Sequence, residues 1–566
     1  NVLSCDFTDH ETFIPQPLDF TRNTLATYVD CNGLIKVSGV SDTNLVENGT
    51  FETPVNNSQW FDFGSPTITE RSQTVAYEGS FSYHIKGDST NDGTQASASQ
   101  FAGDYVIGDT IRVRAYIYPI TASSNQIKSG VANSNRSITS GVVGLILNQW
   151  NFIEYYAEIT TASNNYVTFL ISGTAGEFYL DNVSVNKVDL NVPRIDYLTE
   201  IGKAKELQKP SLLLEPQSTN TATYSNNFTL GDIFTSSGNP NQNNSVITPK
   251  KTNSPDNTND GWELRDNGDG VFGAAQLAYY STTVVSGDTN TFSVFLKKGS
   301  TDLGYIITGG FDASANGTSY FNLSTGTLSN TSTNHSDVRM VDYGNGWYRC
   351  SITITTTTDV VGSFTVGMAT STSIQITRDG SNFLYMFGIQ AETVGYSTSY
   401  IPTSGSTVTR NAESCNNAGQ LGVFNDTEGV LYAEMAALAD DLTFRSISIN
   451  DNTSNEAVVI RFRTNTNRIN GLIRDGGSAV NNLNFDVTDI TDFHKVAYKF
   501  KTGECALYID GTQVATGTST FTLSPLTNLN FDNGVGDFFY GKVREVKAFR
   551  RALTDSELTE LTNNIT

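Results

Sequence analysis

The sequence predicts an all-β chain of several domains, and three of its properties lead to this fold class. Its 566 residues are too many for one hydrophobic core, so we expect three or four domains. Thr, Ser, Asn and Gly are abundant and aromatic residues make up 11% of the chain, which favours strands and turns over helices. Short alternating apolar runs recur between turn signals, a pattern typical of β-sandwiches.

The formal net charge of −23 limits the partners that the chain can have. Proteins that bind nucleic acid usually carry a basic face, and the sequence shows none, so we expect no nucleic-acid partner. No apolar run is long enough to span a bilayer and no signal peptide is visible, so we expect no membrane insertion. The acidic side chains serve solubility, or a few of them bind calcium.

Residues 1–43 are predicted to form a hairpin arm, because Asn32 and Gly33 separate two short β-type runs. The arm is too small to fold by itself. Residues 188–220 differ from their surroundings through a proline and the continuous apolar run 212–214. We interpret this segment as a strut on which the neighbouring modules are mounted.

Two sandwiches of one type are predicted on either side of the strut. In residues 44–187, the segment 110–119 places Ile111, Val113, Ala115 and Ile117 on one strand face, and 178–185 closes the module. Residues 221–400 repeat this order of strands, which indicates a divergent internal repeat. Trp150 and Trp347 precede equivalent strands, so we expect both in the core.

The remaining chain is predicted to be a linker followed by a third β unit. Residues 401–420 are rich in Gly, Ser, Thr and Pro, as linkers are, and residues 421–566 contain several half-buried strand patterns. Near the end, Thr554 and Glu557 are spaced as a capping box. This predicts one short C-terminal helix with Leu558 and Leu561 facing inward.

Several motifs resemble known families. NGTFE (48–52) and FYLDNVSV (178–185) resemble jelly-roll carbohydrate-binding modules of bacterial glycan-degrading enzymes. LYIDGTQVATG (507–517) and FYGKVREVKAFRRALTDSEL (539–558) resemble concanavalin-like and laminin G-like domains. The resemblance therefore implies two jelly-roll β-sandwiches and a C-terminal concanavalin-like β-sandwich.

Four framing segments resemble virion structural proteins of tailed bacteriophages, of the tail-fibre and head-fibre kind. They are LDFTRNTLATYVDCNGLIKV (18–37), NVPRIDYL (191–198), SLLLEPQSTN (211–220) and SYIPTSGSTVTRNAESCNNAG (399–419). In the resembled proteins the first segment runs almost directly into the second. We therefore predict that 44–187 is an insertion and that the arm lies beside the strut.

The resemblance to carbohydrate-binding modules implies a structural calcium site. In those modules an ion ties the N-terminal segment to the last strand, and the matching side chains here are Asn48, Glu52 and Asp181. Calcium prefers six to eight hard oxygen ligands, so backbone carbonyls would complete the shell. The alternative is that these side chains lie in solvated turns.

A glycan-binding surface is the second candidate site, because sugar rings stack on exposed aromatic faces. The loop-like stretch around Trp60, Phe61 and Phe63 offers such rings. Tyr116 and Tyr118 share the polar face of segment 110–119 with Arg112 and Arg114, which could read hydroxyl groups. The alternative is that these aromatic residues belong to the core or to subunit contacts.

No catalytic motif is visible. The four histidines are scattered, and the sequence contains neither HExxH nor GxSxG. The resemblance implies a noncatalytic fibre or decoration protein on the virion surface, bound to other virion proteins, homo-oligomeric and preferably trimeric. Its function would be multivalent adhesion to host cell-surface polysaccharide. The alternatives are a purely architectural component and a glycan depolymerase with carboxylates from distant segments.

Overall fold

A computed structural model describes most of the chain and divides it into two compact units. The large unit comprises Asn1–Val37 and Asn191–Thr566, and the small unit is Ser38–Leu190. The predicted all-β fold is confirmed, with 43 strands and one helix in the described ranges. These ranges are 2–6, 18–57, 59–87, 92–96, 106–121, 127–132, 140–141, 145–159, 166–171, 175–198, 209–228 and 242–563.

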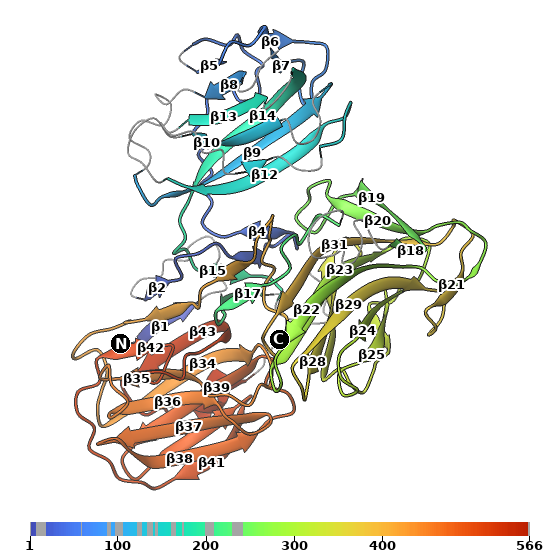
Figure 1. Ribbon diagram of the computed structural model, residues 1–566. Coiled ribbons are helices and arrows are strands. Elements are labelled where there is room, and N and C mark those ends of the chain that lie inside the picture. The colour runs from blue at the N-terminus through green and yellow to red at the C-terminus, as the bar shows by residue number, and fades with distance from the viewer. Residues whose placement is uncertain are drawn as a thin grey trace. The chain divides into compact units, whose positions relative to one another are not determined.

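The small unit is a sandwich of two five-stranded antiparallel sheets (Figure 1). One sheet has the order β11-β10-β13-β8-β5, with strands Ser140–Gly141, Ile127–Ala132, Tyr166–Ile171, Gly93–Ala96 and Trp60–Phe63. The other has the order β12-β9-β14-β7-β6, with strands Asn151–Glu158, Thr110–Pro119, Gly176–Val188, Ser82–Gly87 and Ile68–Ser72.

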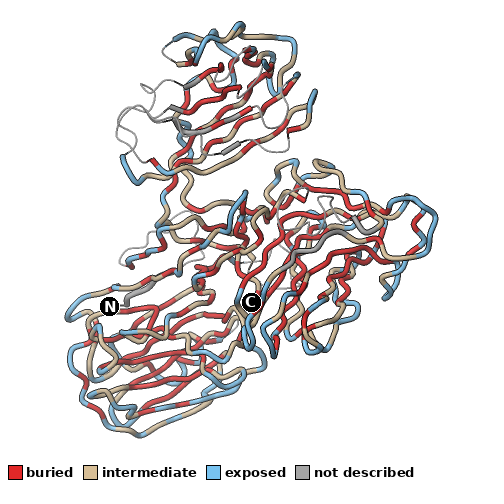
Figure 2. Tube along the Cα trace, in the orientation of Figure 1, coloured by how far each residue is buried: buried red, intermediate tan, exposed pale blue. Residues whose placement is uncertain are grey.

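The alternation in β9 explains how this sandwich forms its core. Ile111, Val113, Ala115 and Ile117 are buried between the sheets, as predicted, and the residues between them are half-buried on the opposite face. Figure 2 shows buried residues along the strands of both sheets. The outward face of β9 is therefore available for polar and aromatic side chains.

The two ends of the small unit lie side by side. The backbone N–H of Asp189 donates to the carbonyl of Gly39 at 2.8 Å, and Val40 forms a β-bridge with Val188. Gly39 has a φ of +77°, and a side chain there would clash with the backbone of Asp189. The unit begins at Ser38 and ends at Leu190, somewhat outside the predicted bounds of 44 and 187.

The first sandwich of the large unit contains two six-stranded sheets. The order β18-β22-β29-β24-β25-β26 joins Gln242–Asn243, Gln276–Val284, Val360–Ala369, Leu303–Gly309, Gly317–Asn322 and Thr327–Asn330. The order β19-β20-β31-β23-β28-β27 joins Ser245–Thr252, Gly261–Asp266, Phe383–Glu392, Thr289–Lys298, Trp347–Thr355 and Asp337–Gly344. A small ribbon pairs β21 (Phe272–Ala274) with β30 (Gln375–Thr377).

The second sandwich of the large unit includes the C-terminal residues. Its larger sheet has the order β15-β16-β43-β34-β39-β40-β41, with β1 also paired to β43. These strands are Arg194–Asp196, Ser211–Leu214, Gly541–Phe549, Glu428–Ala437, His494–Lys501, Cys505–Ile509, Thr512–Gly517 and Val2–Asp6. The smaller sheet, β38-β37-β36-β35-β42, joins Ser478–Asp486, Arg468–Asp475, Ala457–Phe462, Arg445–Asn450 and Asn528–Asn530.

The predicted C-terminal helix is confirmed as α1, Asp555–Thr562. Thr554 and Glu557 form the capping box, since the Glu557 amide donates to the Thr554 hydroxyl and the Thr554 amide donates to the Glu557 carboxylate. Leu558 is fully buried and anchors the helix on the larger sheet, beside Tyr432 and Tyr508.

The arm contacts the strut at several backbone positions. The Arg22 amide donates to the Asn191 side chain at 2.9 Å, and the Val29 amide donates to the Asp196 carboxylate at 2.8 Å. The arm contains β2 (Asp19–Thr21) and the hairpin β3 (Thr27–Val29) with β4 (Ile35–Val37). Residues 7–17 of the arm and 199–208 of the strut lie outside the described ranges.

Residues 401–420, predicted as a linker, are instead an integral part of the large unit. β32 (Val408–Arg410) pairs with β17 (Ser218–Asn220) of the strut, and β33 (Ser414–Asn416) pairs with β2 of the arm. Cys415 is fully buried in the core of the C-terminal sandwich. The Gly and Ser content suggested a linker, but the pairing with distant strands orders this segment.

A buried ion network joins the arm, the strut and this segment. Arg194 donates to both Glu215 and Glu413, Arg22 donates to Glu413 at 3.0 Å, and Arg410 donates to Glu215. All five side chains are at most 4% exposed. Burial alone would raise the pKa of Glu215, but the charges of Arg410 and Arg194 outweigh it and lower that pKa to about 2.

Candidate functional site

Aromatic side chains gather on the outer face of the β12-β9-β14-β7-β6 sheet of the small unit. Tyr116 and Tyr118 extend outward from β9, and Phe152 lies opposite Tyr116 on β12. Trp150 directly precedes β12, and Tyr77 comes from the connection between β6 and β7. We call these five residues the aromatic face.

The rings of the aromatic face contact one another. Tyr77 is stacked on Tyr116, and Trp150 meets both Tyr77 and Tyr118 edge-on, with ring centroids 5.9 and 5.5 Å apart. Phe152 lies 5.2 Å from Tyr116. Tyr77 is 42% exposed and the other four are half-buried, so the group offers ring surface to solvent. Such surface suits the C–H faces of a sugar ring.

Polar side chains continue the same sheet face beyond the rings. Arg112 donates to the amide oxygen of Asn186 at 2.9 Å, and Arg114 donates to the carboxylate of Glu154. Burial and the charge of Arg114 lower the pKa of Arg112. The Nε of Arg112 is buried and has no hydrogen-bond partner within the described ranges. Guanidinium and amide groups beside aromatic rings are suited to binding hydroxyl groups.

The carboxylates near the aromatic face already have hydrogen-bond donors. Glu154 accepts from Arg114 and from the Tyr156 hydroxyl, the latter at 3.0 Å. Glu177 accepts from His84 at 2.9 Å and forms an ion pair with Lys86 at 3.0 Å. Burial alone would raise the pKa of Glu177, but Lys86 and His84 outweigh it and lower that pKa. The lowered pKa keeps Glu177 ionised at neutral pH, and both carboxylates orient the side chains that donate to them.

The structure separates the residues predicted for glycan binding into two groups. Arg112, Arg114, Tyr116 and Tyr118 lie together on the outward face of β9. Trp60, Phe61 and Phe63 lie on β5 of the opposite sheet. The two groups therefore do not form one surface.

Trp60 and Phe63 were wrongly predicted as exposed sugar-stacking residues. Trp60 is 1% exposed and packs against Phe51 and Phe169, and Phe63 is 7% exposed. The indole N–H of Trp60 donates to the backbone carbonyl of Glu47. Their polar neighbours in the sequence suggested a loop, but β5 pairs with β8, which places Trp60 in the core of the sandwich, and Phe63 is buried at the end of the strand. Phe61 is half-buried on this strand.

Three members of the aromatic face, Trp150, Phe152 and Tyr77, were not predicted from the sequence. Trp150 was predicted in the core by analogy with Trp347, yet only Trp347 is buried, at 1% exposure. The outward position of Phe152 could have been predicted from strand alternation, because its neighbour Ile153 is buried. Tyr77 lies in a turn-rich segment with no periodicity, so its position over Tyr116 depends on the fold.

The three side chains predicted to bind calcium do not fit a shared ion as they are placed. Both oxygens of Asp181 accept backbone N–H groups, from Tyr77 at 2.8 Å and from Asn182 at 2.7 Å. Glu52 accepts from the amides of residues 80 and 81, and Asn48 bonds to the backbone of residue 53. In the described ranges no three acidic, histidine or cysteine side chains come together as a metal site. Calcium stays a prediction from the resemblance.

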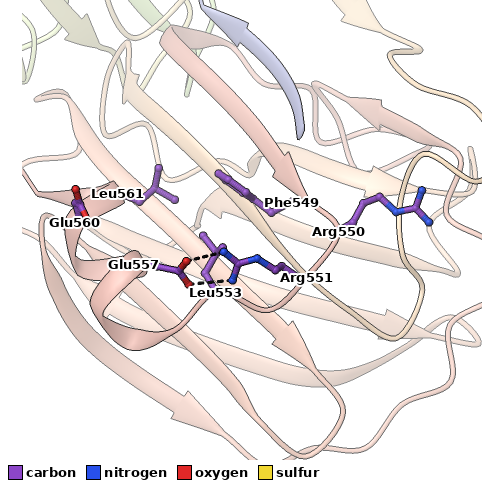
Figure 3. A pocket seen from close by; sticks show the side chains of 7 residues that line it. All are labelled: Phe549, Arg550, Arg551, Leu553, Glu557, Glu560 and Leu561. Atoms are coloured by element: carbon purple, nitrogen blue, oxygen red, sulfur yellow. Dashed lines mark hydrogen bonds and ion pairs between the residues drawn. The ribbon is translucent and has the colours of Figure 1, made fainter. Parts of the chain in front are cut away.

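A hollow in the large unit is a second candidate for ligand binding (Figure 3). Phe549, Leu553 and Leu561 contribute apolar surface, and Arg551 forms an ion pair with Glu557 across it. The open charged rim contains no second aromatic ring. The aromatic face of the small unit is therefore the stronger candidate for ligand binding.

Residues 433–559 match the family model of the concanavalin A-like lectin/glucanases superfamily. The predicted concanavalin-like, laminin G-like sandwich at the C-terminal end is thereby confirmed. No curated protein matches the sequence. Among the described residues, no helix has the length and apolar character needed to cross a membrane.

Solved structures with sandwich folds show distant similarity. One is a Ruminococcus gnavus sialidase CBM40 bound to α2,3-sialyllactose, which is 16% identical with a TM-score of 0.23. The alignment covers 26% of this chain and 94% of the CBM40 chain. The CBM22-1–CBM22-2 tandem of Paenibacillus barcinonensis Xyn10C is 12% identical, covering 63% and 98%, with a TM-score of 0.23. Mouse laminin α1 LG4-5 is 10% identical, covering 49% and 88%, with a TM-score of 0.18. TM-scores this low do not support an inference about function.

Proposed function

We propose that this chain is a noncatalytic glycan-binding protein and that the small unit binds sugar on its aromatic face. The observation that carries the proposal is the gathering of Tyr77, Tyr116, Tyr118, Trp150 and Phe152 on one sheet face, beside Arg112 and Asn186. A pyranose ring stacks on the aromatic surface, and the guanidinium and amide groups bind its hydroxyls.

The placement of the carboxylates favours binding over hydrolysis. Glycoside hydrolysis requires an acid with a free proton and a second carboxylate open to the sugar or to water. Glu154 and Glu177 are instead held by Arg114, Lys86 and His84. Depolymerase activity is the competing function, and release of oligosaccharides from a bound polysaccharide would establish it.

The test is binding of the full chain to a broad glycan array, followed by calorimetry with the strongest ligand. Replacing Tyr116 by Ala removes one ring and the support of Tyr77, so we expect an affinity loss of about tenfold or more. Phe272→Ala is the matched control, because it truncates a 65% exposed aromatic residue in the large unit. Equal affinities for Tyr116→Ala and the parent protein would overturn the proposal.

We also propose that copies of the chain are displayed on the surface of a tailed-phage particle, bound to other virion proteins. The four framing segments that resemble phage structural proteins supply every member of the buried ion network, which supports a shared structural framework. A homo-oligomer, preferably a trimer, would convert weak sugar contacts into adhesion to host polysaccharide.

Light scattering of the purified protein tests the oligomeric state, and antibody labelling of purified phage particles under the electron microscope tests the location. A monomer at micromolar concentration, or unlabelled particles, would contradict this part of the proposal. If the particles are labelled and no glycan binds, a purely architectural function is supported instead.

A further inference from the structure

A basic cluster lies on the outer face of the smaller sheet of the C-terminal sandwich. Along β36, Val458 and Ile460 belong to the core, so Val459 and Arg461 face the opposite side, and Arg463 continues this alternation. Arg474 of β37 lies opposite Ala457, on the same side. We call Arg461, Arg463 and Arg474 the arginine cluster.

An aromatic ring and a row of amides surround the arginine cluster. The guanidinium carbons of Arg461 and Arg463 lie 4.4 and 5.7 Å from the ring centre of Phe444. Arg461 donates to Asn470 at 2.9 Å, and Arg463 donates to Asn484 at 2.9 Å. The cluster therefore has a fixed geometry on the sheet.

The charge of the arginine cluster is poorly neutralised, although the whole chain carries −23. Arg461 lies 3.9 Å from Asp537, and this is the one ion pair of the cluster among the described residues. The nearby Arg468 is already paired with Asp486, at 2.6 Å. Burial and the charge of Arg463 lower the pKa of Arg461 to about 10. Among the described residues, the three arginines of the cluster thus share one carboxylate partner, Asp537.

Hydrogen-bond donors in the cluster also lack partners. The Nε atoms of Arg463 and Arg474 are buried, and neither has a hydrogen-bond partner in the part of the chain that the structure describes. The hydroxyl of Ser446, opposite Arg461 on β35, is likewise buried and has no hydrogen-bond partner among the described residues. Buried donors without acceptors are unfavourable. These atoms are closed to solvent, so a ligand with acceptor oxygens would bind the outer guanidinium nitrogens of the half-buried Arg463 and Arg474.

We propose that the arginine cluster binds acidic polysaccharide through the carboxylates of its sugar residues. Guanidinium groups bind carboxylates by two parallel N–H donors, and three of them on one sheet face match a chain of repeated acidic sugars. The amides of Asn482 and Asn484 bind neighbouring hydroxyls, and Phe444 provides an apolar contact. This site is separate from the aromatic face of the small unit.

The test measures binding of the full chain to polygalacturonate by calorimetry, with neutral dextran and dextran sulfate as comparison polymers. The double variant Arg463→Gln/Arg474→Gln removes two half-buried arginines and leaves the more buried Arg461 in place. We expect polygalacturonate to bind, dextran not to bind, and the double variant to lose at least tenfold in affinity.

The double variant Arg550→Gln/Arg551→Gln is the matched control, because it removes the same charge from the hollow near the C-terminal helix. It should bind polygalacturonate within twofold of the parent protein. An equal loss in both double variants would indicate a general charge effect and overturn the proposal. If the protein binds dextran sulfate but not polygalacturonate, the assignment of carboxylates as the ligand groups is overturned. If Tyr116→Ala abolishes polygalacturonate binding, the polymer binds the small unit and the arginine cluster is not its site.

Discussion

The ring of Tyr77 lies almost parallel to that of Tyr116, with ring centroids 3.4 Å apart and an angle of 14° between the planes. Tyr77 therefore covers one face of Tyr116 and presents its own outer face to solvent. A sugar bound to the aromatic face would contact the solvent-facing rings of Tyr77 and Trp150, and Tyr116 packs against the opposite face of Tyr77.

Replacing Tyr77 by Ala should weaken sugar binding less than replacing Tyr116 does. The loss of one stacked ring corresponds to roughly 0.5–1.5 kcal/mol, or about two- to tenfold in affinity, and the uncovered Tyr116 partly replaces the lost surface. Calorimetry with the same ligand measures both variants. A larger loss for Tyr77→Ala than for Tyr116→Ala would contradict this order of contacts.

The ion network of the large unit predicts a large stability effect at Glu413. This carboxylate accepts from Arg194 and Arg22, which are fully buried, and from the Glu215 amide at 2.9 Å. Glu413→Gln leaves buried positive charge uncompensated, so the free energy of unfolding should fall by about 3–5 kcal/mol. Denaturant unfolding, followed by tryptophan fluorescence, measures the change.

The exposed pair of Arg551 and Glu557 provides the comparison for Glu413. Both side chains are at least 40% exposed, so Glu557→Gln should change the free energy of unfolding far less than Glu413→Gln does. Glu557 also caps α1, and Gln retains that capping ability. Equal effects of the two substitutions would show that the buried network contributes no more than a surface pair.

The fold could be predicted largely from local patterns, because alternation and turn residues act over short distances. The alternation in residues 110–119 placed four core residues and four outward residues correctly. The capping box at Thr554 and Glu557 identified α1. Both features depend on neighbours that are close in the sequence.

The candidate site could be predicted only in part, because it combines segments that are distant in the sequence. Tyr116 and Tyr118 follow from alternation, but Tyr77 reaches them through a turn held by Asp181. Trp60 looks exposed in the sequence and becomes buried only because β5 pairs with β8. In the same way, the composition around Arg410 is typical of a linker, and only the fold brings this side chain to its buried partner Glu215.

Calcium should have little effect on the stability of the small unit. Asp181, Glu52 and Asn48 already accept backbone N–H groups, so an ion would have to displace these bonds before it could bind. We expect the melting temperatures in excess EDTA and in millimolar calcium to agree within about 1 °C. A clear increase with calcium would instead support the ion implied by the carbohydrate-binding-module resemblance.

Mild acid should stabilise the small unit through Asp181, which is fully buried on β14. Burial raises the pKa of Asp181 to about 6, and the charge of Glu52 adds to this effect, while the N–H groups of Tyr77, Glu78 and Asn182 oppose it. In the unfolded chain the pKa of an aspartate is near 3.9, so on acidification Asp181 binds a proton in the folded state at a higher pH than in the unfolded state. The contribution of Asp181 to the free energy of unfolding therefore rises as the pH falls from about 7 towards 4.

The variant Asp181→Asn isolates this contribution. Asn cannot titrate, so the difference in unfolding free energy between the parent and the variant should move in favour of the parent as the pH falls from 7 to 4.5. Thermal unfolding of both proteins at several pH values measures that difference. A difference that stays constant with pH, or moves in the opposite direction, would contradict a raised pKa at Asp181. Because the Asp181 carboxylate also holds the Tyr77 amide, the same series should show whether its protonation changes sugar affinity.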